Sequence, residues 1–291
     1  MDKYYNIGNH HFRVTGNAFV EALEKLPEFT IFEDSTHENA EFTIEECVES
    51  TTQIPSFQKI IQTYKDELTD GVFGITANGY LTRQTFVDGA SYHYWTIDKE
   101  KKVYIQSHST PWTAKIVIMN CYELITADMG TLSIHSSCIV YKQQAILFLG
   151  KSGTGKSTHT QLWREYIPGS HLLNDDSPIL RFEDGQLWAY GCPYSGKTPC
   201  YRQERFPIAG FVRLSQAPYN RITKQTTILH AYGTLLPSFP YIFQYKNELN
   251  NSLNTFIGKV ISSIPVYCLE CLPDKEAALL SFHTFFPDEI L

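Results

Sequence analysis

The sequence lacks any apolar run long enough to cross a bilayer. Its longest purely apolar stretches, Ile116–Met119 and Ala145–Leu149, fall far short of the ~20 residues that a spanning helix needs. The first residues, Met1–Asn6, also lack the apolar core of a signal peptide. Charged residues are few, at 19%, and form no basic stripe that could bind a nucleic-acid backbone. We therefore expect a cytoplasmic protein whose partners include neither membrane nor nucleic acid.

A disulfide framework is also missing. The seven cysteines are an odd number scattered along the chain, which favours free thiols. Cys268 and Cys271 form a C-x-x-C, but zinc would need a second ligand pair, and a redox site would need a helix start where Pro265–Leu269 has the pattern of a strand. We interpret these two cysteines as structural.

What the sequence does contain is enough apolar material for a large core. The 291 residues are 43% hydrophobic and 14% aromatic, which is typical of one large globular domain or two smaller ones. Residues 1–50 account for the net charge of −7, since they hold 3 Lys and Arg against 11 Asp and Glu and the rest of the chain is close to neutral. Apolar residues are interleaved with these charges, which favours a solvated surface over an interaction tail.

Residues 1–130 are predicted to be a β-rich region. A short helix is expected at Ala18–Leu26, where apolar residues recur at helical spacing. The remaining segments are rich in Tyr, Phe, Thr and Ile and punctuated by turn residues. The predicted strands are Tyr4–Val14, Phe29–Phe32, Glu41–Val48, Val72–Ala77, Tyr80–Phe86, Tyr92–Ile97 and Val103–Gln106.

Residues 131–291 are predicted to form a second domain of mixed α/β (α+β) class, joined to the first by a helix at Trp112–Ala127. Strands and helices mix without strict alternation, which favours a mixed sheet. The predicted strands are Leu132–Tyr141, Ala145–Leu149, His171–Leu173, a hairpin around Asp184-Gly185, and Phe206–Leu214. Helices are predicted from Lys156, at Thr227–Leu236 and at Leu249–Ser262, before a final strand and helix.

The strongest signal is a complete G-x-x-x-x-G-K-[ST] motif, a P-loop, at Gly150–Ser157. It follows an apolar strand and precedes a helix. Its glycines let successive backbone N–H groups point into one anion-sized hollow at a helix N-terminus. Lys156 would reach the β- and γ-phosphates of a nucleotide, and Ser157 would place its hydroxyl on Mg²⁺. The residues predicted to bind ATP are Gly150, Lys151, Ser152, Gly153, Thr154, Gly155, Lys156, Ser157 and Thr158.

Two adjacent carboxylates, Asp175 and Asp176, end the strand that follows the P-loop helix. Two carboxylates at this short separation raise each other's pKa unless a cation or a transferred proton compensates their charge. Neighbours on an extended backbone face opposite sides, so one carboxylate is expected to serve the metal and the other the nucleophile. The alternative is a solvent-exposed turn that caps Ser177-Pro178.

These motifs resemble the catalytic domain of HPr kinase/phosphorylase and the nucleotide site of its relative, phosphoenolpyruvate carboxykinase. The resemblance covers about residues 131–214 and includes His135, which lies before the P-loop at the interval found in HPr kinases. It implies a P-loop kinase domain with a mixed sheet, in which Lys156 and His135 contact the transferring phosphate. It also implies that Asp176 is the general base that takes a proton from an acceptor hydroxyl. Asp175 is then expected to bind Mg²⁺ together with Ser157.

The sequence departs from that family in two places. Glu204-Arg205 is a loose counterpart of the Glu-x-Arg-Gly stretch whose Glu completes the metal site of HPr kinases, and it lacks both the spacing and the glycine. Residues 1–130 do not resemble the HPr kinase N-terminal domain, so the resemblance does not extend to the acceptor. HPr kinases assemble, and the resemblance is compatible with a homo-oligomer.

The function predicted from these features is an ATP- and Mg²⁺-dependent kinase that acts on a hydroxyl of a peptide, a protein or a small molecule. The alternatives are a P-loop NTPase, with water as acceptor, and a nucleotide sensor without turnover. Ser195-Gly196-Lys197 is a candidate second phosphate loop, and Arg202, Arg205 and Arg213 are candidates for neutralising transition-state charge. Most loop cations are simply solvated. Residues 1–130 are expected either to recognise the acceptor or to mediate assembly.

Overall fold

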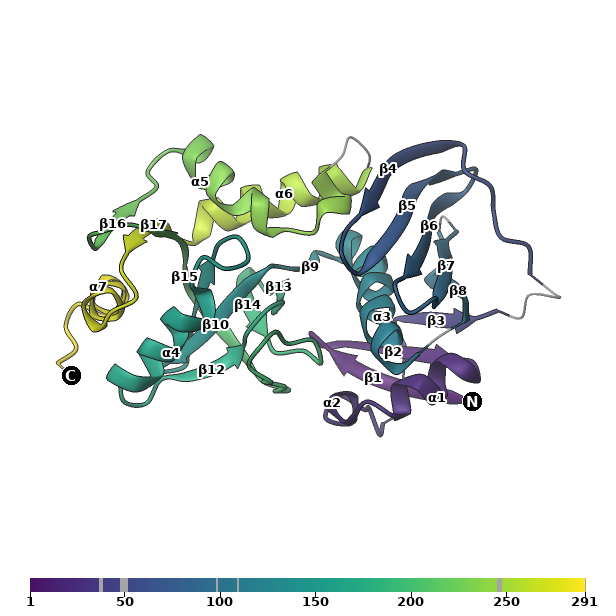
Figure 1. Cartoon of the computed structure of the whole chain (residues 1–291), viewed down its shortest axis with the longest axis horizontal. Coiled ribbons are helices and arrows are strands. Elements are labelled where there is room, and N and C mark those ends of the chain that lie inside the picture. Colours follow the sequence, from purple (N-terminus) through teal and green to yellow (C-terminus); the bar gives the residue numbers. More distant parts are fainter. Residues whose placement is uncertain (37–38, 48–51, 98, 109, 245–247, 291) are drawn as a thin grey trace. The chain divides into compact units, whose positions relative to one another are not determined.

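The computed structural model describes the whole chain except residues 37–38, 48–51, 98, 109, 245–247 and 291. The chain divides into two compact units, Met1–Met129 and Gly130–Leu291. Each unit combines a mixed sheet with helices (Figure 1), so the predicted mixed α/β class is confirmed. Within the described residues, no helix is long and apolar enough to cross a membrane.

Unit 1 is an eight-stranded sheet, counted over its described residues, with three α-helices. The strands pair in the order β1-β2-β3-β8-β7-β6-β5-β4. Their bounds are Asp2–Ile7 (β1), His10–Thr15 (β2), Phe42–Glu46 (β3), Lys59–Lys65 (β4), Thr69–Thr76 (β5), Gly79–Phe86 (β6), Ser91–Thr96 (β7) and Lys102–His108 (β8). The helices are Ala18–Glu24 (α1), Pro27–Thr30 (α2) and Pro111–Thr126 (α3), and a 3-10 turn follows at Ala127–Met129.

The core of unit 1 forms where α3 packs against the sheet. Tyr122 of α3 is buried and donates its hydroxyl to the carbonyl of Ile7 at 2.9 Å. Its ring contacts Phe12 and Phe42, whose own rings stack with centroids 4.8 Å apart. The alternation of buried and half-buried residues along β2 matches the period of a strand with one covered face.

Unit 2 is built on a nine-stranded mixed sheet in the described part of the chain, with the path β12-β10-β11-β15-β14-β13-β9 and with β17 and β16 attached to β15. The strands are Thr131–Ser133 (β9), Ser136–Tyr141 (β10), Gln144–Leu149 (β11), His171–Asn174 (β12), Ile179–Glu183 (β13), Gln186–Tyr190 (β14), Arg205–Gln216 (β15), Arg221–Lys224 (β16) and Val266–Cys271 (β17). The helices are Lys156–Tyr166 (α4), Ile228–Leu235 (α5), Glu248–Ser263 (α6) and Lys275–Phe285 (α7), with 3-10 turns at Leu236–Ser238 and Tyr241–Gln244.

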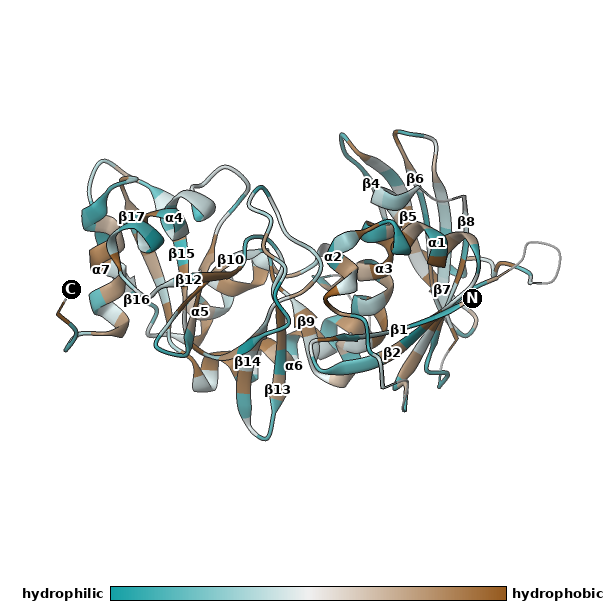
Figure 2. Ribbon diagram, turned by 90° about the horizontal axis from the view of Figure 1, so that it is seen from below, coloured by the Kyte–Doolittle hydropathy of each residue, from teal (hydrophilic) through white to brown (hydrophobic). Residues whose placement is uncertain are grey.

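Helices α4 and α7 lie side by side on one face of this sheet (Figure 1). Trp163 of α4 is fully buried between Phe148 of β11 and Phe282 of α7. Its indole N–H donates to the hydroxyl of Ser281 at 2.8 Å. Every residue of β10 is buried, and part of its ribbon has the brown of hydrophobic residues in Figure 2. The helix that follows the P-loop is therefore held firmly on the sheet.

Some sequence predictions were wrong in detail. The predicted strand Phe29–Phe32 instead forms the second half of α2 and the turn after it, because Pro27 occupies the first turn of α2, where its fixed φ favours a helix. The predicted strand Tyr4–Val14 is a hairpin that turns at Gly8 and Asn9, both with positive φ. Strands β4 and β16 were not predicted, and Val48, the end of another predicted strand, lies outside the described residues.

The predicted strand Leu132–Tyr141 is divided into β9 and β10. Ile134 and His135 leave the ladder because their N–H groups donate to the carbonyls of Pro178 and Ser238 instead. The predicted strand at Pro265–Leu269 is confirmed by β17, which extends to Cys271, and all seven cysteines are free.

We expect Trp163→Ala to destabilise unit 2 by about 3–5 kcal/mol, because it leaves a large cavity between β11 and α7. Urea unfolding followed by circular dichroism measures the loss. Ile228→Ala removes an exposed side chain and should change the free energy of unfolding by no more than about 0.5 kcal/mol. Equal effects of the two substitutions would contradict this account of the core.

Candidate functional site

The pairing of four strands brings the predicted site residues to one edge of the unit 2 sheet. In the antiparallel pair of β10 and β11, Ser136 lies opposite Leu149, so His135 lies at the level of Gly150. Strand β12 runs antiparallel to β10, and the N–H of Ser136 donates to the carbonyl of Asp176 at 2.8 Å. Strand β15 is parallel to β11 and places Arg213 opposite Leu149. His135, the P-loop, the carboxylate pair and Arg213 therefore converge.

The P-loop has the backbone that its glycines predict. Gly150, Gly153 and Gly155 all have positive φ, and Gly155 is the left-handed N-cap of α4. A Cβ on Gly150 would lie 2.3 Å from the hydroxyl of Thr154, so a larger residue at that position would have to displace the Thr154 side chain. The N–H groups in the first turn of α4, which have no acceptor within the helix, thus face the loop. An anion site at a helix N-terminus requires this arrangement.

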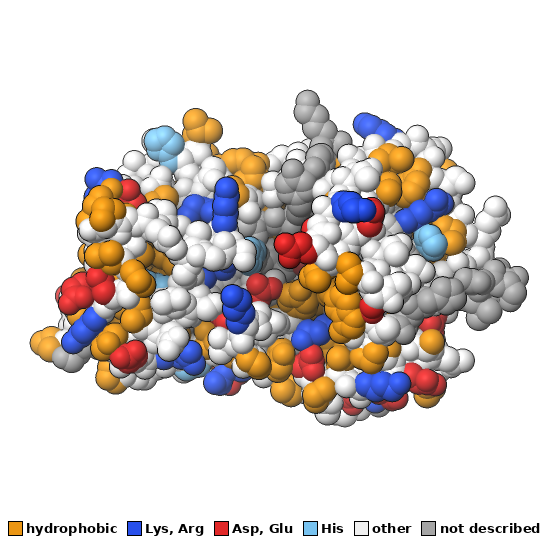
Figure 3. All heavy atoms as spheres, in the orientation of Figure 1, with side chains coloured by type: hydrophobic (Ala, Val, Ile, Leu, Met, Phe, Trp, Pro, Cys, Tyr) orange, Lys and Arg blue, Asp and Glu red, His pale blue; other side chains and the backbone are white. Residues whose placement is uncertain are grey.

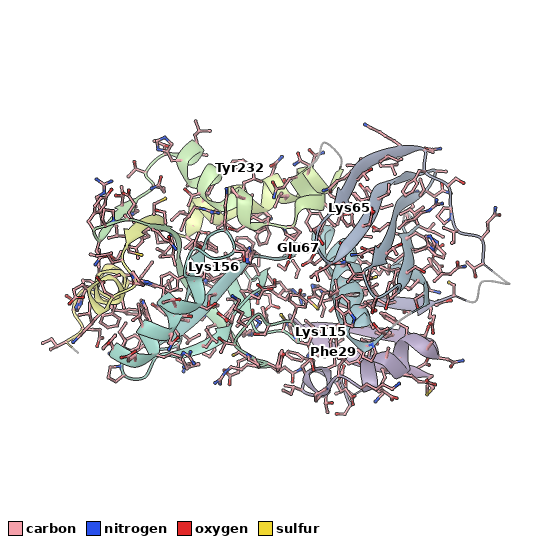
Figure 4. All side chains as sticks on the ribbon, viewed as in Figure 1. Phe29, Lys65, Glu67, Lys115, Lys156 and Tyr232 are labelled. Carbon is pink, nitrogen blue, oxygen red and sulfur yellow. The ribbon has the colours of Figure 1, made fainter. Side chains whose placement is uncertain are left out.

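Lys156 is buried at the start of α4 (Figure 4). Its ammonium donates to the carbonyls of Gly150 at 3.0 Å and Lys151 at 3.4 Å, so it lies across the base of the loop. Burial lowers the pKa of Lys156, and the nearby positive charge of Arg213 lowers it too, whereas Asp176 and Asp175 raise it. The ammonium therefore lies in a partly desolvated position where an anion would stabilise it.

His135 and Asp176 face each other beside this lysine. The imidazole Nε2 lies 3.6 Å from Oδ1 of Asp176, and both side chains are partly exposed, at 41% and 28%. Burial is the main cause that lowers the pKa of His135, followed by the charge of Lys156, while Asp176 opposes the shift. At neutral pH the imidazole is therefore mostly uncharged, and the Asp176 carboxylate remains accessible to a small molecule.

Asp175 occupies a different environment from its neighbour. It is buried, and its carboxylate accepts hydrogen bonds from the Ser137 hydroxyl at 2.6 Å and the Thr198 N–H at 3.1 Å. Ser137 also bonds with Thr160, one turn along α4 from Ser157. The backbone turn after β12 is held by Asn174, whose side-chain oxygen accepts from the N–H groups of Asp176 and Ser177. Ser137 and Asn174 were not predicted as site residues.

Arg213 is the candidate arginine that the strand pairing brings to the site. Its guanidinium donates to the Thr234 carbonyl at 2.6 Å and to the Ser238 hydroxyl at 2.8 Å. Among the described residues it has no carboxylate partner, and burial lowers its pKa. It is close enough to lower the pKa of both Lys156 and His135. A half-buried cation without a counter-ion, next to a second one, favours an anionic ligand.

The other two candidate arginines have carboxylate partners. Arg205 pairs with Glu183 and stacks on Trp188, and Arg202 lies 3.6 Å from Glu204. Glu204 precedes the first residue of β15, nine residues before Arg213, which corresponds to roughly 25–30 Å along an extended strand. On the face drawn in Figure 3, Lys and Arg are interspersed with Asp and Glu.

The predicted Ser195-Gly196-Lys197 loop packs directly on the carboxylate pair. A Cβ on Gly196 would lie 2.9 Å from the carbonyl oxygen of Asp175 and 3.3 Å from the Cβ of Asp176. The loop is tied down by Asn174, which donates to the carbonyl of Tyr194 at 2.8 Å. The backbone of Lys197 is thus held next to Asp176, with its side chain exposed.

The oxygen groups of the site are of the kind that Mg²⁺ prefers. In the described part of the chain, no group of three His, Cys, Asp or Glu side chains could hold a metal ion. The Ser157 hydroxyl and the carboxylates offer hard oxygen ligands, and Mg²⁺ commonly takes its other ligands from substrate phosphates and water. Ser157 and Asp175 would hold the ion.

Comparisons with known proteins add little to this geometry. No family model matches the chain, and no curated protein matches it significantly. Among solved structures, the Hpr(Ser) kinase/phosphatase from Coxiella burnetii aligns with 54% of this chain and 99% of its own, at 15% identity and a TM-score of 0.32. We therefore base the function on the geometry of the site.

The charges around His135 predict opposite shifts of its pKa in two variants. Lys156→Met removes a positive charge and should raise the pKa of His135, whereas Asp176→Asn removes a negative charge and should lower it further. NMR titration of the imidazole protons measures both, with the wild-type midpoint expected below the ordinary value of about 6.5. Identical midpoints in all three proteins would show that these groups do not share one site.

Proposed function

We propose that unit 2 is a Mg²⁺-dependent phosphotransferase that passes the γ-phosphoryl group of ATP to a hydroxyl acceptor. One observation carries the proposal: a single sheet edge combines a P-loop with a partly exposed carboxylate, an uncharged histidine and an arginine without a counter-ion. The P-loop accounts for phosphate binding, and the carboxylate accounts for activation of an acceptor. A protein that only binds nucleotide would need the first feature but not the second.

Each side chain has a role that follows from its surroundings. Asp176 accepts the proton of the acceptor hydroxyl as the new P–O bond forms and the bond between the γ-phosphorus and the bridging oxygen of ADP breaks. Lys156 and Arg213 compensate the negative charge on the transferring group and on the leaving oxygen, the usual source of catalysis in phosphoryl transfer. His135, uncharged and next to Asp176, positions the acceptor or the γ-phosphate by hydrogen bonding.

Mg²⁺ would neutralise phosphate charge when bound with ATP. On the protein side, Ser157 follows the P-loop lysine in the first turn of α4, and Asp175 is fixed near that turn through Ser137 and Thr160. Asp175 is held in place by buried hydrogen bonds, which favours a role as a metal ligand. Asp176 is partly exposed, which favours contact with the acceptor.

The proposal includes a peptide, a protein or a small alcohol as acceptor, and recognition of that acceptor by unit 1 stays a prediction. Incubation with γ-labelled ATP, Mg²⁺ and cell extract tests the activity. Label on a peptide or metabolite supports the kinase. Label found only in free phosphate would indicate an NTPase, and tight ATP binding with no release or transfer of label would indicate a sensor.

We expect Lys156→Ala to lower the rate of ATP turnover by about 10²–10³-fold and to weaken ATP binding, because it removes the ammonium placed to contact the β- and γ-phosphates. Ser157→Ala should act mainly by raising the Mg²⁺ concentration needed for half-maximal rate. Calorimetry and rates across a Mg²⁺ titration separate the two effects. Lys259→Ala, an exposed lysine of α6, is the matched control. Wild-type affinity and rate in both P-loop variants would mean that the loop is vestigial.

Asp176→Asn should lower the transfer rate by about 10²–10⁴-fold, the usual contribution of general acid–base catalysis. The amide keeps the size of the carboxylate but does not take the proton, so affinity for Mg·ATP should barely change. Asp175→Asn should instead weaken Mg²⁺ binding and raise the Mg²⁺ concentration needed for half-maximal rate, so excess Mg²⁺ or Mn²⁺ should restore part of the activity.

The control for both carboxylate variants is Asp184→Asn, at the tip of the β13–β14 hairpin. Single-turnover transfer of label measures the chemical step apart from ATP binding. Transfer by Asp176→Asn at the wild-type rate would exclude this residue as the base, even if ATP binding by the P-loop were intact.

A further inference from the structure

A cavity of about 700 Å³ adjoins the P-loop in unit 2. Its walls are the loop residues Gly153–Gly155, the first two turns of α4, the end of β15 and the segment that joins β17 to α7. None of its lining residues belongs to the cluster of His135, Asp176 and Arg213. The cavity is therefore a feature distinct from the carboxylate side of the site.

The topology of the sheet explains why this cavity lies where it does. Strands β11, β15 and β17 are neighbours and run parallel. Their carboxyl ends meet at one edge, where ligands bind in open α/β sheets. The segments that leave these ends are the P-loop, Gln216-Ala217 and Leu272-Pro273, and each of them contributes to the cavity. The N–H of Ala217 donates to the carbonyl of Cys271 at 3.1 Å and holds the last two segments together.

The lining of the cavity is uncharged. It contains no Asp, Glu, Lys or Arg. Burial lowers the pKa of His159 to about 3, and the imidazole Nε2 bonds with Ser281, so this histidine is neutral. Burial likewise raises the pKa of the Cys271 thiol. Leu162 and Leu272 supply apolar surface, and the Gln216 amide makes only a long contact of 3.4 Å with Gly153.

An uncharged, largely apolar cavity of this size fits a flat neutral ring with a polar edge, since small-molecule pockets span about 300–1,000 Å³. A second anion would find no cation in the lining. The P-loop borders the cavity through Gly153 and Gly155, while Gly150 lies at the level of His135. A triphosphate bound to the loop would therefore extend from the cavity towards Asp175 and Asp176.

We propose that this cavity holds the base and ribose of a purine nucleoside triphosphate, with Leu162 and Leu272 against the ring and Gln216 at its polar edge. The inference rests on the proposed function, because the phosphates of the same molecule occupy Gly150–Ser157. It adds that the nucleoside, not the acceptor, enters from the α4–β17 side, which leaves the Asp176 side to the acceptor.

Cys271 provides a direct probe, because it lines the cavity and is half-buried. Alkylation by N-ethylmaleimide at pH 8.5, resolved by peptide mass spectrometry, reports each cysteine separately. Mg·ATP at ten times its Kd should slow alkylation of Cys271 about 10-fold, whereas Mg·tripolyphosphate at ten times its own Kd should leave it nearly unchanged. Cys268 lies on the same strand but contacts Thr234 instead, and Cys47 lies in unit 1, so both serve as internal controls.

A filled cavity provides the second test. Ala217→Phe places a ring in the cavity and should raise the Kd for Mg·ATP at least about 10-fold, with the Kd for tripolyphosphate unchanged, because only the nucleoside is displaced. Ser215→Phe adds the same ring two residues earlier at an exposed position that does not line the cavity. It should leave both affinities close to those of the wild type.

The outcomes separate this inference from the proposed function. If calorimetry detects neither ATP nor tripolyphosphate binding, the phosphate site itself is wrong and the inference falls with it. If ATP binds but protects Cys271 no better than tripolyphosphate, or if Ala217→Phe weakens both ligands equally, the nucleoside lies elsewhere and only the cavity assignment is overturned.

Discussion

The antiparallel pairing of β10 with β11 is the constraint on which the rest of the site depends. A two-residue turn at Lys142 and Gln143, both with positive φ, sets this pairing, and the register then runs without a shift from Tyr141 to Ser136. Because side chains alternate between the faces of a strand, a slip of one residue would exchange the side chains that β10 presents to its two covered faces. The register that builds the core therefore also sets His135 at the level of Gly150.

Charge balance is the second constraint, and it connects the structure to ligand binding. Burial lowers the pKa of both Lys156 and Arg213, the charge of Arg213 lowers the pKa of Lys156 further, and the nearby carboxylates offset the shift of Lys156 only in part. In a medium of reduced dielectric constant, such neighbours repel strongly. A polyphosphate would relieve that repulsion and use the unpaired N–H groups at the start of α4. The same charges that cost stability in the free protein are those that would select an anion.

The sequence was sufficient for those parts of the site that depend on local pattern. The P-loop is recognisable because its glycines are needed by its backbone. His135 was predicted from the resemblance alone, and the hairpin of β10 and β11 is what sets it at the level of Gly150. The break at Ile134 and His135 was missed, since it arises from hydrogen bonds to the distant Pro178 and Ser238. Arg213 could not be told from a solvated arginine, because only the parallel pairing of β15 with β11 brings it to the P-loop. The cavity has no sequence signal, because its walls come from segments far apart in the chain.

Asp175 shows how the two sides of the site are connected. Its carboxylate bonds with Ser137, which also contacts Thr160 in the P-loop helix, and with the N–H of Thr198 in the loop that carries Lys197. The close approach of Gly196 to Asp175 leaves that loop no room to shift towards the carboxylates. A ligand that moves the first turn of α4 would therefore move Asp175 and, through it, the loop beside Asp176. Buried hydrogen-bonded groups pass on displacements in this way because the interior is densely packed. The loop beside Asp176 is thus tied to the P-loop helix through Asp175 and Ser137.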